Sequence, residues 1–105
     1  MGTGVIVLDG AQSVKVWNGQ AESMWGLRAT EAEGEHLMNL EIGLPVEKLT
    51  GLLRSALSGD SDGERVLEVE AVNRVGKPVT CRVTVIPLAA ADGRTGAVLL
   101  MENSA

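Results

Sequence analysis

The chain contains no phenylalanine and no tyrosine, and its only aromatic residues are Trp17 and Trp25. It therefore lacks the series of aromatic side chains on which successive nucleotide bases could stack. Basic residues are also few, because 9 lysines and arginines stand against 14 aspartates and glutamates, for a net charge of -5. Proteins bind phosphate backbones mainly through basic side chains, so we expect no nucleic-acid partner.

Cysteine and long apolar runs are equally scarce. The single cysteine, Cys81, cannot form an internal disulfide, and the N-terminus has neither the basic start nor the cleavage site of a secretory signal. The longest apolar runs, Val5–Leu8 and Ala97–Met101, have strand length and fall short of the about 18 residues that span a bilayer. We expect a cytoplasmic location and no membrane contact by this segment.

Groups for catalysis or metal binding are sparse. His36 is the only histidine, so no serine has a recognisable base together with a second group that would orient that base. The acidic segment Asp60–Glu64 is no calcium loop, since Gly63 comes too early and no glutamate closes the motif. We expect no catalytic residues and no metal site.

Hydrophobic patterning predicts five strands. Two short runs, Val5–Leu8 and Val14–Trp17, flank a polar turn at Asp9-Gly10 and predict a hairpin. Three later runs predict an antiparallel meander, and they cover Val66–Val72, Val79–Pro87 and Gly96–Met101.

The segment between the two groups of strands predicts helices. Asn18 suits the N-cap of a short helix that ends at Gly26, and Thr30 with Glu33 matches a capping box for a second. Pro45 is expected to open the one long helix, which carries an apolar stripe and ends at Gly59. The whole pattern predicts one α+β domain with helices on one face of the sheet.

The segment WNGQAESMWGLRATEAEG, at residues 17–34, resembles a PAS domain, in which a W-N-x-x-A-E pattern follows the second strand and an E-x-x-G follows in the short helices. The similarity extends over GVIVLDG, VEKLTGLLRSALSG, VNRVGKPVTCRVTVIPL and DGRTGAVLLMEN, which is nearly the whole chain. The pieces LEIGLPVEKL and AVNRVGKPV further resemble PAS segments attached to chemotaxis receptor methyltransferases and bacterial sensor histidine kinases.

The resemblance implies a single PAS domain over residues 1–105, cut from a larger bacterial signalling protein. It implies an antiparallel sheet of five strands in the order 2-1-5-4-3, a pocket between sheet and helices, and dimerisation through the sheet face or the termini. The implied function is sensory: the domain binds a small ligand or a partner and relays a signal to an adjacent output domain. The domain itself is expected to be no enzyme, although the full-length protein is expected to carry an output domain such as a methyltransferase or histidine kinase.

Site residues follow from the strand and helix patterns combined with this resemblance. Candidate pocket residues, all expected on the inner face of the sheet or its helices, are Trp25, Leu37, Leu40, Leu53, Leu57, Val69, Cys81 and Val83. Trp17 alternates out of phase with Val14 and Val16, so it is expected on the outer face, together with Met101, as an interface for a partner.

No known cofactor is expected. Haem-binding PAS relatives commonly carry the iron ligand on the long helix, whereas Val46–Ser58 contains no histidine and His36 falls in a predicted loop. Flavin-binding relatives carry an N-C-R-F-L-Q segment, and ATEAEGEHLMNL stands in its place. The sequence is compatible with binding of an unidentified small ligand. It also leaves two alternative functions open: a ligand-free dimerisation or docking module, and a haem-dependent gas or redox sensor.

Overall fold

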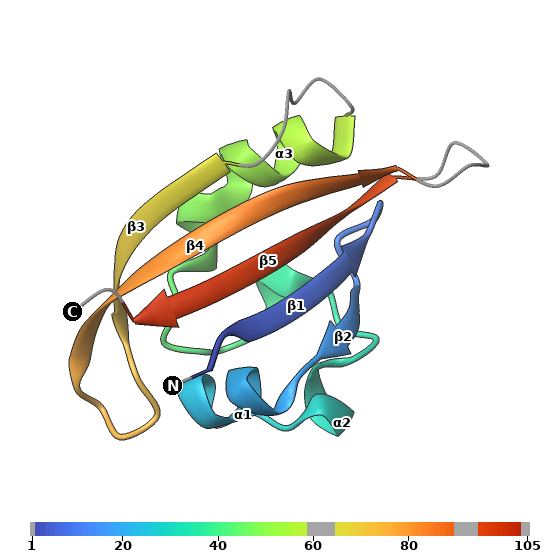
Figure 1. Cartoon of the computed structure of the whole chain (residues 1–105). Coiled ribbons are helices and arrows are strands. Elements are labelled where there is room, and N and C mark those ends of the chain that lie inside the picture. The colour runs from blue at the N-terminus through green and yellow to red at the C-terminus, as the bar shows by residue number, and fades with distance from the viewer. Residues whose placement is uncertain (1, 59–64, 90–94, 104–105) are drawn as a thin grey trace.

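One antiparallel sheet forms a layer of the computed structural model, which describes residues 2–58, 65–89 and 95–103 (Figure 1). Its strands lie in the order β2-β1-β5-β4-β3, which confirms the order 2-1-5-4-3 implied by the resemblance. The strands are β1 (Gly4–Asp9), β2 (Val14–Trp17), β3 (Arg65–Val72), β4 (Pro78–Ala89) and β5 (Thr95–Asn103). The first and last strands therefore pair at the centre of the sheet.

The helical segment between β2 and β3 packs on one face of this sheet, with α1 against β1 and α3 against β4 and β5 (Figure 1). Its elements are α1 (Gly19–Trp25), α2 (Ala29–Ala32), η1 (Leu37–Asn39), η2 (Val46–Leu49) and α3 (Thr50–Ser58). We call the face that they cover the inner face and the opposite one the outer face. The predicted α+β class and the helices on a single face are confirmed.

Asn18 joins α1 to the start of β1. Its side-chain Oδ1 accepts the backbone N–H of Ala21, which confirms the predicted N-cap, and also that of Val5, both at 2.9 Å. Its Nδ2 donates to the carbonyl of Thr3 at 3.0 Å. Gly26 ends the helix in the left-handed region, with φ 74°, as predicted. The side chain of Asn18 therefore caps α1 and also binds the backbone at the N-terminal end of β1.

Two predicted helix starts are wrong. The capping box of Thr30 with Glu33 does not form, because the N-cap of α2 is Arg28, two residues before Thr30, and the helix begins at Ala29. Pro45 opens a 3₁₀ turn, in which the N–H of Lys48 donates to the carbonyl of Pro45 at 3.0 Å, and the α-helix begins only at Thr50. In a 3₁₀ turn each N–H donates to the carbonyl three residues earlier, whereas in an α-helix it donates to the carbonyl four residues earlier, so the turn is tighter. The predicted end at Gly59 and the acidic segment 60–64 lie outside the described residues.

The core fills the space between the inner face and the helices. Alternate residues of the central strands are buried, and α3 contributes Leu53 while η1 contributes Leu37. Each fully buried aliphatic side chain of this size stabilises the fold by about 1.5–3 kcal/mol. Among the residues that the structure describes, no polar or charged side chain is buried, so hydrophobic contact dominates the stability of this interior.

A bulge in the β1–β2 pair decides where Trp17 lies. Val7 is opposite Val16, but Leu8 is opposite Val14, so Lys15 is an extra residue in β2. Such a residue shifts the alternation of the strand by one. Trp17 therefore points inward and is 3% exposed.

The expectation that Trp17 and Met101 lie on the outer face is wrong. Trp17 is buried by the bulge, and its Nε1 donates to the carbonyl of Leu27 at 2.7 Å. Met101 is 0% exposed because it stands in register with Gly4 and Val83 on the inner face. Neither side chain is accessible to a partner in the folded domain.

Candidate functional site

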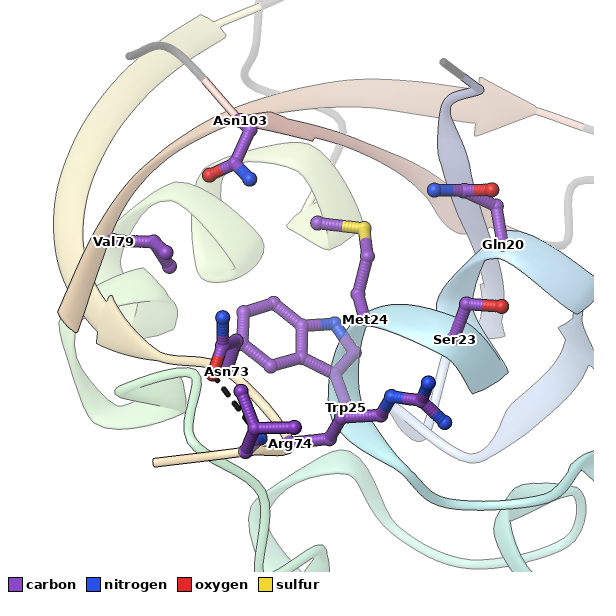
Figure 2. Close-up of a pocket in the computed structure, with 9 residues that line it drawn as sticks. Gln20, Ser23, Met24, Trp25, Asn73, Arg74, Val79 and Asn103 are labelled. Atoms are coloured by element: carbon purple, nitrogen blue, oxygen red, sulfur yellow. Dashed lines mark hydrogen bonds between the residues drawn. The ribbon is translucent and has the colours of Figure 1, made fainter. Parts of the chain in front are cut away.

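A cavity of about 360 Å³ lies between α1, the β3–β4 hairpin and the end of β5 (Figure 2). Its lining residues come from these three segments, which are far apart in sequence. They are Gln20, Ser23, Met24, Trp25, Asn73, Arg74, Val75, Val79 and Asn103. A volume of this size is within the range of sites for small molecules.

Trp25 forms the apolar floor of the cavity together with Met24 and Val79 (Figure 2). The indole is 6% exposed, and its Nε1 donates to the Sδ of Met101 at 3.4 Å. A thioether is a weak acceptor, so this bond fixes the orientation of the indole but adds little to the stability of the fold. The floor is therefore apolar, and only a small part of the indole is exposed in it.

The hairpin supplies the polar rim. The backbone N–H of Arg74 donates to the carbonyl of Met24 at 3.2 Å, which ties the hairpin to α1. Gly26 permits this approach, since a Cβ there would lie 3.1 Å from the Cβ of Arg74. The Oδ1 of Asn73 accepts the backbone N–H groups of Val75 and Lys77 at 3.1 and 2.9 Å. The rim is thus held by backbone contacts and by one side-chain cap.

Of the predicted pocket residues, the structure brings Trp25 to this cavity. The others lie in the hydrophobic core or against it, away from the lining. They are Leu37, Leu40, Leu53, Leu57, Val69, Cys81 and Val83. Burial raises the pKa of the Cys81 thiol to about 11, so the reactive thiolate is suppressed at neutral pH.

Sequence patterns did not single out Arg74, Asn73 or Asn103. The turn NRVG lies between two predicted strands, and its polar residues resemble those of any exposed hairpin. Only the packing of the hairpin against α1 turns two of these side chains toward a cavity. No signal in the local sequence distinguishes such a turn from a solvated one.

His36 lies where η1 begins, and its ring acts as a cap. The Nδ1 accepts the backbone N–H of Met38 at 3.1 Å, and His36 forms an isolated bridge with Ser13. It does not line the cavity. Within residues 2–58, 65–89 and 95–103, no three histidine, cysteine or acidic side chains come close enough to hold a metal ion.

An apolar surface covers much of the outer face. We define the outer apolar patch as Val5, Val7, Val16, Val66, Ile86, Leu88, Val98 and Leu100. None of the described helices packs on it (Figure 1), and Val16 and Val66 are 43% and 55% exposed. Within the described part of the chain, no helix is both long and apolar enough to cross a membrane.

The family model described as the PAS fold matches residues 1–103, and the chain belongs to this family. No curated protein is significantly similar in sequence. Among solved structures, the PAS domain of the histidine kinase ThkA is 18% identical with a TM-score of 0.77, and the match covers 98% of this chain and 100% of that one.

Two further structures share the fold. A sensory box sensor histidine kinase from Vibrio cholerae is 15% identical with a TM-score of 0.78, and 100% of this chain matches 84% of that one. The PAS domain of a protein from Colwellia psychrerythraea is 19% identical with a TM-score of 0.74, over 96% and 85% of the two chains. At these identities the likeness concerns the fold.

Proposed function

We propose that this chain is the sensory module of a cytoplasmic bacterial signal-transduction protein, without catalytic activity of its own. It forms a homodimer through the outer face of its sheet and passes a signal through β5 to an adjacent output domain, such as a histidine kinase or the methyltransferase of a chemotaxis pathway. The observation that carries the proposal is the outer apolar patch, which lies over the pairing of the first and last strands. The names of the similar histidine kinases support the same class of function.

The composition of the patch favours a second copy of the chain. Val5 pairs with Leu100 and Val7 with Val98, so aliphatic side chains from the two central strands form its middle. At one end of the face, charges of both signs follow, with Arg82 3.9 Å from Glu68. An apolar centre bordered by mixed charges suits a two-fold contact, in which each copy presents the same surface.

Strand β5 connects this surface to the rest of the molecule. It pairs with β1 on one side and with β4 on the other, and it ends at Asn103 beside the cavity. A change in the cavity or in the dimer contact therefore acts on the strand that leads toward the C-terminus. The cavity favours a sensor that binds a ligand over a module that only dimerises.

Val98→Asp tests the proposed dimer, because it places a charge at the centre of the outer apolar patch. A buried charge without a partner costs about 2–5 kcal/mol, which corresponds to at least about a thirtyfold higher dimer Kd. Sedimentation equilibrium measures that constant, and circular dichroism checks that the variant is folded. Val72→Asp is the control, since Val72 is 45% exposed and lies outside the outer apolar patch, at the far end of β3.

Equal dimerisation by Val98→Asp and the wild type, or a monomeric wild type at all concentrations, would contradict the dimer. In the full-length protein, Val98→Asp is expected to change the activity of the output domain as well. A folded monomeric variant with unchanged output would contradict the route through this face.

A further inference from the structure

The polar lining of the cavity consists of uncharged groups and one cation. Amides come from Gln20, Asn73 and Asn103, a hydroxyl from Ser23, and the guanidinium from Arg74. Among the described residues, no carboxylate lines the cavity and none forms a salt bridge with Arg74. A positive group without a partner is thus present at this cavity in a chain whose net charge is negative.

The contacts of the hairpin leave donors for a ligand. Because the Oδ1 of Asn73 already accepts two backbone N–H groups, its Nδ2 is the atom that stays available. The backbone of Arg74 is held against α1, so its side chain starts from a fixed point at the rim. A guanidinium binds carboxylates through two parallel hydrogen bonds, which gives geometric specificity as well as affinity.

The floor requires a different chemistry at the other end of the ligand. Trp25 and Val79 present an apolar surface, and the thioether of Met24 adds a soft, polarisable group (Figure 2). The indole of Trp25 is 6% exposed, so only a small part of it reaches the cavity, and Met24 and Val79 supply further apolar surface. Sulfur packs well against the edges of aromatic rings. A ligand with an apolar body therefore matches the floor, while a fully polar anion leaves it unoccupied.

We infer that this cavity binds a small amphipathic carboxylate, with its apolar body against Met24, Trp25 and Val79 and its carboxylate at Arg74. The inference rests on the proposed sensory function and gives that function a ligand class. Asn103 lies on the same cavity at the end of β5, so the bound molecule contacts the strand that leads toward the output domain.

Four probes separate the contributions of charge and apolar body. Indole-3-acetate carries both features, indole-3-acetamide is its neutral counterpart, tryptamine is a cation with the same ring, and acetate has no ring. Binding is followed by NMR through the two indole N–H signals. Trp17 serves as an internal reference, because its Nε1 is bonded to Leu27 and it does not line the cavity. Indole-3-acetate is expected to move the Trp25 signal and leave that of Trp17 in place.

Three variants test the recognition of the carboxylate. Arg74→Gln is expected to weaken indole-3-acetate by at least about tenfold, as expected for a lost charge-assisted bond. Asn73→Asp keeps the oxygen that caps the hairpin but replaces the free donor with a negative charge, so it is expected to abolish binding. Lys77→Gln removes a charge from the same hairpin outside the lining, and it is expected to change the affinity less than twofold.

The proposal is overturned if indole-3-acetate leaves the Trp25 signal unmoved, if the amide, the cation or acetate binds as tightly, or if Arg74→Gln and Lys77→Gln behave alike. These outcomes are distinct from a failure of the proposed relay. Binding is measured on the isolated chain, whereas the relay is tested by the dimer constant and output activity of Val98→Asp. A chain that dimerises and signals without binding indole-3-acetate would refute the ligand alone.

Discussion

Replacing Asn18 with alanine removes three hydrogen bonds at the point where α1 meets β1. The lost helix cap alone costs about 1 kcal/mol. The bond from Val5 and the bond to Thr3 each contribute about 0.5–1.5 kcal/mol, and both leave a backbone group without its partner. We therefore expect Asn18→Ala to lower the free energy of unfolding by about 2–4 kcal/mol, more than a cap alone explains.

Urea denaturation followed by tryptophan fluorescence measures this loss. Asn39→Ala is the control, because Asn39 is exposed on η1 and its side chain forms no hydrogen bond with the residues that the structure describes. This variant is expected to change stability by less than about 0.5 kcal/mol. Asn18→Asp keeps both acceptor contacts and loses only the donor to Thr3, so it is expected to be less destabilising than Asn18→Ala. The reasoning is refuted if Asn18→Ala costs no more than about 1 kcal/mol, or if the alanine and aspartate variants are equally unstable.

Three further predictions concern a cofactor, the thiol and a close backbone contact. Purified protein is expected to show no haem or flavin absorption, and a haem band that disappears in His36→Ala would contradict this. Because burial raises the pKa of Cys81 from 9.0 to about 11, the unfolded chain ionises first, so stability is expected to fall as the pH rises from about 9 to about 11. Unfolding titrations over that range test this, and an equal decline in Cys81→Ala would show that the thiol is not responsible. Gly43→Ala would place a Cβ in steric conflict with the carbonyl oxygen of Val72, so it is expected to destabilise the fold by at least about 1–3 kcal/mol in thermal unfolding. Gly51→Ala has open space in a helix and is expected to be neutral or stabilising, and similar stabilities for these two variants would contradict the clash.

Local patterns in the sequence predicted the five strands and both ends of α1. The alternation along β4 predicted which residues face the core, and Cys81 and Val83 are buried as that pattern requires. Asn18 and Gly26 marked the two ends of α1, because capping depends on the chemistry of residues next to the helix. The resemblance to PAS domains supplied the strand order, which periodicity alone could not, since several orders bury the same faces.

Tertiary structure decided what depends on contacts between distant segments. The register of β1 against β2 produces the bulge that turns Trp17 inward. The sequence of β2 contains no residue that predicts this bulge. The cavity arises because the β3–β4 hairpin packs on α1 across about fifty residues of sequence, which brings Arg74 to Met24. A sequence pattern records the surroundings of each residue along the chain. The partners that make Trp25 and Arg74 parts of one candidate site are set by the folding of the sheet onto its helices.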